Sequence, residues 1–152
     1  MMIASALLFI SCEDNRRQGL CDDTIYLVKN GVQKVNIKND APGKISIWAT
    51  KAGYMNQATT VNYSVDESLL EGTGYDLMPS NCYLADVWSF EVKEVGEFAK
   101  FDIVFYPDEI LALDNQKVAL PLRISSDELE IVEGKDNAIV VVSVVEAEAE
   151  TE

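Results

Sequence analysis

The feature that most constrains the fold of this chain is a series of short runs in which apolar and polar residues alternate. Within residues 98–106, Phe101, Ile103 and Phe105 share one side of an extended chain, and residues 60–65 repeat the pattern. Successive side chains of a β-strand point to opposite faces, so each run predicts a strand with one buried face. Turn signals spaced about 8–12 residues apart are typical of a β-sandwich. We therefore predict an all-β antiparallel sandwich of about seven to eight strands.

The residues between the runs predict how the strands connect. Asn30-Gly31 is the strongest short hairpin signal, because a type I′ turn needs positive φ at both central residues. Pro121 predicts that its strand is an edge strand or the start of one, since proline cannot donate to the ladder. Asp66 predicts the N-cap of one short helical turn, whose residues Leu69 and Leu70 would plug one end of the sandwich. The strands are expected within residues 24–29, 32–38, 44–51, 60–65, 85–95, 98–106, 118–124 and 137–145.

Length and charge limit the class of protein. At 152 residues the chain has the size of one domain, and we predict that the sandwich occupies residues 24–145. The net charge of −14 argues against nucleic acid as a partner, because phosphate contacts require clustered Lys and Arg. The chain has no histidine, so it cannot build a Ser-His-Asp or Cys-His catalytic site. We expect no cofactor.

The first residues have the features of a targeting signal. Residues 1–11 are uncharged and almost entirely apolar, which suits a signal-peptide core and is too short to span a bilayer. Cys12 follows directly, and Leu-Phe-Ile-Ser-Cys looks like a relaxed lipobox. We predict that Cys12 is lipidated and that residues 12–23 form a tether. The absence of a basic residue at the start predicts a start codon further upstream. Residues 146–152 are predicted to form an acidic, disordered tail.

Three motifs follow one another in an order that resembles one protein family. A strand ends in Val-Asp-Glu-Ser-Leu-Leu at residues 65–70, and Tyr-Asp-Leu-Met-Pro follows at residues 75–79. After an aromatic strand, Leu-Pro-Leu-Arg-Ile closes the series at residues 120–124. This order resembles the immunoglobulin-like N-terminal domain of Bacteroidetes surface lipoproteins, known as domain of unknown function 1735. The resemblance covers residues 25–145, and the chain departs from it at residues 71–74, where many members have Tyr-Asn.

The resemblance implies a fold, a location and a context. It implies an immunoglobulin-like sandwich exposed at the cell surface, anchored by lipid in the outer membrane. Such domains occur ahead of glycoside hydrolase modules, among them family 18 endo-β-N-acetylglucosaminidases, and ahead of laminin-G-like and discoidin-like modules in glycan-utilisation systems. Any catalysis in such a system would therefore belong to a separate domain.

Paired carboxylates are one candidate chemistry, because glycosidases hold two of them about 5–10 Å apart in a cleft. Asp66 is better explained as a helix cap, and Asp108-Glu109 as a turn after proline. Adjacent residues on a strand point to opposite faces, so neighbouring acids make poor catalytic pairs. We therefore predict no catalytic residue and no enzyme activity. The carboxylates considered are Asp66, Glu67, Asp76, Asp108 and Glu109.

Acidic loops and cysteines give weaker signals. Asp22-Asp23 and Asp127-Glu128 offer oxygen ligands for Ca²⁺, but neither loop has the Asp spacing of an EF-hand. We therefore predict no metal site. Cys21 and Cys82 would be able to pair in an exported chain, but Cys21 falls in the predicted tether. We expect two unpaired thiols.

Aromatic side chains are the better candidates for a binding site, because flat rings stack on the apolar faces of sugars. Trp48 and Tyr54, with Asn56 and Gln57 nearby in sequence, would form one patch, and Trp88 would form another. The alternative is that both tryptophans are packing residues, since a buried tryptophan is common in β-sandwiches. Exposed rings would favour glycan binding, and buried rings would favour a scaffold.

Two functional hypotheses follow. The first is a non-catalytic, lipid-anchored protein of the outer membrane that serves a polysaccharide-utilisation system as an accessory, spacer or glycan-binding domain. Its partners would be a polysaccharide and the outer-membrane proteins of glycan uptake. The alternative is a structural or adhesion lipoprotein that docks other proteins through a sheet edge and binds no sugar.

Overall fold

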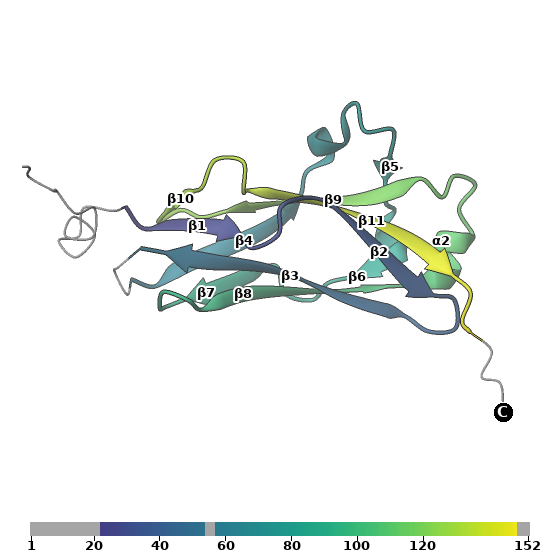
Figure 1. The fold of residues 1–152 in the computed structure, drawn as a ribbon, viewed down its shortest axis with the longest axis horizontal. Coiled ribbons are helices and arrows are strands. Elements are labelled where there is room, and N and C mark those ends of the chain that lie inside the picture. Colours follow the sequence, from purple (N-terminus) through teal and green to yellow (C-terminus); the bar gives the residue numbers. More distant parts are fainter. Residues whose placement is uncertain (1–21, 54–56, 149–152) are drawn as a thin grey trace, which may run out of the picture.

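The computed structural model describes residues 22–53 and 57–148 of the chain. Two sheets pack face to face in the predicted all-β sandwich (Figure 1). Sheet A has the strand order β10-β1-β3-β8-β6, and sheet B has the order β2-β11-β9-β4-β7, with β5 beside β9. The strands are β1 (Thr24–Leu27), β2 (Gly31–Lys38), β3 (Gly43–Ala52), β4 (Thr59–Val65), β5 (Asp76–Leu77), β6 (Tyr83–Leu84), β7 (Ser89–Val92), β8 (Phe98–Phe105), β9 (Val118–Ser125), β10 (Glu130–Ile131) and β11 (Asn137–Val145).

The predicted sandwich is confirmed, but it contains more strands than predicted, and some of them are very short. Three of its strands, β5, β6 and β10, are only two residues long. Most strand pairs are antiparallel, but β1–β10, β2–β11 and β5–β9 are parallel. The expected helical turn is the 3-10 helix η1 (Glu67–Leu70), and η2 (Ser80–Cys82) and the helix α2 (Pro107–Leu111) join it.

The core lies between the two sheets and follows the alternation of the sequence. Phe101, Ile103 and Phe105 are fully buried on the inner face of β8, as predicted. Tyr63 from the opposite sheet stacks on Phe101 with 4.6 Å between ring centroids. Its hydroxyl donates to the carbonyl oxygen of Ala99 at 2.9 Å, so the buried phenol is satisfied. Burial raises the pKa of Tyr63 well above its usual value.

The hairpin predicted at Asn30-Gly31 is wrong. Strand β1 pairs with β3 in sheet A, whereas β2 pairs with β11 in sheet B. Gly31 has a φ of 77°, but no other residue than glycine has positive φ in the described ranges, so Asn30 cannot form a type I′ turn. The Asn30 side chain instead donates to the carbonyl of Gly134 at 2.9 Å. The segment between β1 and β2 therefore carries the chain from one sheet to the other.

The prediction that Pro121 marks an edge strand is also wrong, because β9 lies inside sheet B. Pro121 faces Ile139 of β11 on one flank. On the other flank β9 pairs with β5 as far as Ala119 and with β4 from Leu122 onward. Pro121 stands where one neighbour replaces the other, so the N–H that proline lacks breaks no ladder.

The capping role of Asp66 is confirmed, whereas the place predicted for the leucines is wrong. The Asp66 carboxylate accepts from the backbone N–H of Ser68 at 3.1 Å and begins η1. Leu70 then packs on the outer face of sheet B and does not plug an end of the sandwich. It forms a small cluster with Ala119, Ile139 and Val141, to which Leu69 and Tyr75 add.

A buried ion pair secures the end of the sandwich where the described chain begins. The Lys51 ammonium lies 3.4 Å from the Asp23 carboxylate, and the exposed fractions of the two side chains are 0% and 7%. Lys51 also donates to the carbonyl of Gln57 at 2.9 Å. Strand β1 begins at this end of the long axis, and β11 ends at the opposite end (Figure 1).

Several predictions fall outside the described residues. They are the signal segment 1–11, lipidation of Cys12, the tether as far as Cys21, the ring and amide of Tyr54 and Asn56, and the last residues of the acidic tail. Cys82 is a buried free thiol whose pKa burial raises. Within the described ranges, no helix has the length and apolar character needed to cross a membrane.

Candidate functional site

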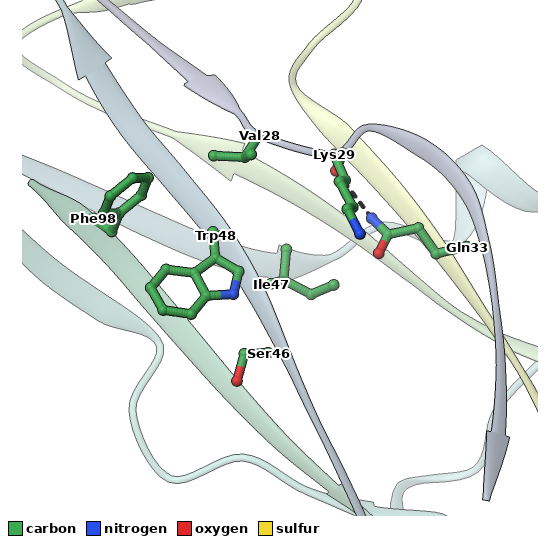
Figure 2. Close-up of a pocket in the computed structure, with 7 residues that line it drawn as sticks. All are labelled: Val28, Lys29, Gln33, Ser46, Ile47, Trp48 and Phe98. Carbon is green, nitrogen blue, oxygen red and sulfur yellow. Dashed lines mark hydrogen bonds between the residues drawn. The ribbon is translucent and has the colours of Figure 1, made fainter. Parts of the chain in front are cut away.

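A cleft of about 470 Å³ opens on the outer face of sheet A. It lies beside the segment that joins β1 to β2, where the chain passes from one sheet to the other. Figure 2 shows the rings of Trp48 and Phe98 on one side of the cleft and the side chains of Lys29 and Gln33 on the other. The lining residues are Val28, Lys29, Gln33, Ser46, Ile47, Trp48 and Phe98.

The alternation of two paired strands places the aromatic rings on this face. On β3, Ile47 and Ala49 point into the core, so Trp48 between them points outward. Phe98 lies on β8 opposite Thr50 in the register, and it faces the same way. Trp48 and Phe98 keep 40% and 53% of their residue surface exposed. Their ring centroids are 5.4 Å apart and the rings are nearly perpendicular, a favourable edge-to-face arrangement.

Polar groups surround the rings. The Gln33 amide donates to the Lys29 carbonyl at 2.9 Å, which ties β2 to the crossover segment. The Ser46 hydroxyl donates to the Asp102 carboxylate, and this bond, with help from Lys44, holds the pKa of Asp102 below its usual range. The indole N–H of Trp48 has no hydrogen-bond partner within the described residues. The cleft therefore presents an apolar wall together with unused hydrogen-bonding capacity, as small-ligand sites do.

The other predicted site residues lie elsewhere or outside the described ranges. Trp88 is half-buried against the core, 4.8 Å from Phe101 between ring centroids, and its indole N–H donates to the carbonyl of Ala85 at 2.9 Å. Gln57 is exposed in the loop after β3. Neither Gln57 nor Trp88 lines the cleft beside Trp48, and the binding roles of Gln57 in the first predicted patch and of Trp88 in the second stay predictions.

The predicted strand around Trp88 is shorter than expected. It covers only Ser89–Val92, the strand β7. Val87, expected to point inward, is 54% exposed, whereas both Trp88 and Phe90 pack against the core. The imperfect alternation of this run accounts for the error, because Val87, Trp88 and Phe90 are all apolar and only two of them pack against the core.

Three of the five carboxylates considered for catalysis, Asp66, Asp76 and Glu109, have structural partners. Asp66 pairs with Arg123 at 2.6 Å in addition to capping η1. The Asn115 amide donates to Asp76 at 2.5 Å, and the Asn81 amide donates to Glu109 at 2.6 Å. Asp108 lies with Glu109 in the first turn of α2, where acids suit the helix dipole.

Another depression, of about 480 Å³, lies between η1 and β5. It is lined by Glu67, Glu71 and Asp76, with Ser68, Leu70, Tyr75 and Leu77. Of the loops considered for Ca²⁺, Asp23 is held by Lys51, and Glu128 accepts from the backbone N–H of Thr60 at 3.2 Å. Among the described residues, no three metal-ligating side chains of the His, Cys, Asp or Glu type gather in one place.

Sequence reasoning selected Trp48 but missed its neighbours in the cleft. Phe98 had a usable signal, because it occupies the face of β8 opposite to Phe101, together with Lys100 and Asp102. An aromatic residue on the otherwise polar face of an amphipathic strand is a candidate for a binding site. Val28 and Lys29 carried no such signal, since their place depends on a sheet crossing that the hairpin prediction had excluded.

A protein-family model described as an N-terminal domain matches residues 21–131. No curated protein matches the chain. Several solved structures share its fold. A structure from Bacteroides ovatus, described as a "putative carbohydrate binding protein", aligns over 79% of this chain and 36% of its own with a TM-score of 0.64 and 15% identity. A protein of unknown function from the same species aligns over 79% of this chain and 44% of its own, with a TM-score of 0.64 and 18% identity.

A third solved structure is a multidomain protein from Bacteroides ovatus that includes the domain of unknown function 1735. It aligns over 81% of this chain and 44% of its own, with a TM-score of 0.54 and 15% identity. This chain thus spans less than half the length of these three relatives. At such low identity the alignments show a common fold.

Proposed function

This chain belongs to the family of N-terminal domains known as domain of unknown function 1735, and from that premise we propose that it is a non-catalytic, glycan-binding spacer domain. The single observation that carries the proposal is the exposed Trp48 ring, which contacts Phe98 edge to face in a cleft on the outer face of sheet A. A flat ring of this kind matches the apolar face of a pyranose. The described relatives include a "putative carbohydrate binding protein" and proteins of unknown function, none of them described as an enzyme.

The rings are placed so that a sugar needs little rearrangement to bind. Trp48 and Phe98 stand on paired strands of one sheet, and rigid strands fix side chains better than loops do. Ser46 and the Trp48 indole N–H flank the apolar wall and offer hydrogen bonds to hydroxyl groups. A prepared site loses less entropy on binding, which favours useful affinity from a small contact area.

The spacer part of the proposal is supported by the path of the chain. The described chain enters the sandwich at one end of the long axis and leaves it at the other (Figure 1). Such a domain adds its full length to the separation of whatever stands before and after it. This chain spans only 36% and 44% of its first two relatives, which leaves room in them for further domains.

The proposed location is the outer membrane, with lipid attached to Cys12. It is supported by the apolar residues 1–11 and by the Leu-Phe-Ile-Ser-Cys motif that follows them. Metabolic labelling with radioactive palmitate should mark the wild-type protein in cells, and Cys12→Ser should remove the label. A label that persists in the variant would refute this location of the anchor.

Glycan binding is tested by affinity electrophoresis of the full chain, carrying Cys12→Ser, through gels that contain single polysaccharides. At least one polysaccharide should retard the protein, and Trp48→Ala should migrate as it does in an empty gel. Trp88→Phe serves as the matched control, because it keeps a ring in the core but changes the other tryptophan. Retardation by no polysaccharide, or equal retardation of Trp48→Ala, would refute the proposal.

The alternative, protein docking through a sheet edge, is favoured by β2. It is an edge strand of eight residues, longer than the other three sheet edges β6, β7 and β10. Its exposed side chains include Lys34 and Lys38, however, and lysines on an edge typically prevent strand addition. Capture of outer-membrane proteins by the wild type, lost when Val35→Pro blocks the edge, would support this alternative.

A further inference from the structure

We propose that the glycan bound in the Trp48 cleft is anionic, carrying carboxylate groups as in uronic acids or sulfate groups. The proposal rests on the glycan-binding function above and adds the chemical class of the ligand. It is carried by the charges around the cleft, which differ in sign from those of the rest of the protein.

The positive charge of the chain is concentrated in the segment that builds the cleft. Residues 22–52 contain five lysines and three acids, Asp22, Asp23 and Asp40, which gives a net charge of +2. Since the whole chain carries −14, the remaining residues carry −16. The strands β1, β2 and β3 and the crossover between them all lie in this basic segment.

The geometry brings lysines to the rim of the cleft. Lys29 lines it, and its ammonium has no ion-pair partner within the described residues. Lys100 lies across from Trp48 in the strand register, with its ammonium 5.4 Å from the centre of the indole ring. On the same face of sheet A, Lys135 lies 5.2 Å from the centre of the Tyr26 ring.

The acid beside the cleft does not cancel this charge. Asp102 is shared by Lys44 at 3.0 Å and Lys100 at 3.5 Å, and it also accepts from Ser46. Two lysines thus face one carboxylate, and Lys29 adds a third positive charge on the other side. The seven residues that line the cleft include no Asp or Glu.

An anionic sugar uses every part of this arrangement. The pyranose ring has an apolar face for Trp48, and its carboxylate or sulfate can reach Lys29 or Lys100 in a charge-assisted hydrogen bond. A neutral glycan would leave the lysines without a role. A polyanion approaching a protein of −14 is otherwise repelled, so a local group of lysines is what such a ligand requires.

The test compares polymers that differ only in charge. Polygalacturonate, alginate and hyaluronan are offered to the full chain, carrying Cys12→Ser, beside their carboxyl-reduced forms, in which each uronic acid is converted to the neutral sugar. At least one acidic polymer should bind about tenfold or more tightly than its reduced form, since hydrogen bonds to charged groups are the stronger ones. Chondroitin sulfate and its desulfated form test the sulfate source in the same way.

Paired lysine variants locate the preference. Lys29→Gln with Lys100→Gln should remove most of the difference between acidic and reduced polymers. Lys34→Gln with Lys38→Gln is the matched control, because it changes net charge equally on exposed residues of β2 that do not line the cleft. The preference should also weaken as salt rises, since screening acts over about 10 Å at 0.1 M ionic strength. Near-ultraviolet circular dichroism checks that all variants are folded.

The outcomes separate this inference from the function beneath it. Equal binding of acidic and reduced polymers, lost in Trp48→Ala, would overturn the anionic ligand and leave glycan binding intact. A preference that survives in the Lys29 and Lys100 variant would likewise overturn it. Failure of every polymer to bind the wild type would overturn both proposals.

Discussion

The outer faces of the two sheets both carry apolar residues, but these residues are covered on one sheet and exposed on the other. On sheet B, Ala119, Ile139 and Val141 are covered by Leu70, which η1 places over them. On sheet A, Trp48 and Phe98 are left uncovered and line a cleft. One face is closed by the protein's own chain, and the other is left open by the residues that the structure describes.

The way in which η1 is held explains why the first face stays closed. Asp66 caps the helix and pairs with Arg123 on β9, and Arg123 also pairs with Asp136. This network fastens the segment after β4 to the strand that it covers. No segment is held over Trp48 in this way within the described ranges. This contrast is consistent with the proposed binding role of the exposed rings, because an uncovered apolar patch is a feature of interaction sites.

The largest expected effect comes from opening the closed face. Leu70→Ala should lower the free energy of unfolding by about 2–4 kcal/mol, since it removes a buried side chain and leaves a cavity over sheet B. Urea denaturation followed by circular dichroism measures this. A loss near zero would show that η1 only rests on the sheet, and the contrast between the faces would fail.

The matching substitution on the open face should cost less. Trp48→Ala should lower the free energy of unfolding by only about 1 kcal/mol, chiefly the edge-to-face contact with Phe98, while it abolishes retention by polysaccharide. The same urea experiment and affinity gels decide the matter. If Trp48→Ala destabilised the protein as much as Leu70→Ala, Trp48 would be a structural residue.

The closed face should also respond to pH. The Ser68 side chain, followed by Arg123, lowers the pKa of Asp66 in the folded state, so the Asp66 carboxylate contributes stability above its ordinary pKa of about 3.9. This contribution is lost as pH falls through the lower, folded-state pKa. The melting temperature of the wild type should therefore exceed that of Asp66→Asn at pH 7, and the two should converge in strong acid.

Ser68→Ala is the companion variant for this measurement. It keeps the carboxylate but removes the largest cause of the lowered pKa. Its dependence on pH should therefore lie between those of the wild type and Asp66→Asn. A constant gap between wild type and Asp66→Asn at all pH values would contradict the assigned role.

The smallest effect tests the fine structure of the open face. The Lys100 ammonium above the Trp48 ring predicts a favourable coupling of about 0.5 kcal/mol, which is typical of exposed cation–π pairs. A double-mutant cycle with Trp48→Leu and Lys100→Gln, measured by urea denaturation, gives this coupling. A coupling of zero would show that Lys100 is held by Asp102 alone.

Local features of this chain could be predicted from the sequence, whereas pairings across the fold could not. The inward face of β8 and the cap at Asp66 depend on residues close in sequence, and both were predicted correctly. The hairpin predicted at Asn30-Gly31 and the edge strand predicted at Pro121 were wrong because strand pairing at both places depends on strands far along the chain. These are β11 in the first case and β5 in the second. The cleft depends on the same sheet crossing, which is why Trp48 was selected without Val28 and Lys29.

The most direct test of a binding face on sheet A is a map of backbone amide shifts by nuclear magnetic resonance. The labelled protein would be titrated with an oligosaccharide of whichever polysaccharide retards it in the gels. The account predicts that shifts cluster at residues 28–33, 46–48 and 98–102 and that the indole N–H of Trp48 moves while that of Trp88 does not. Shifts that cluster at Leu70, Ala119 and Ile139 instead would place the ligand on the closed face and contradict the account.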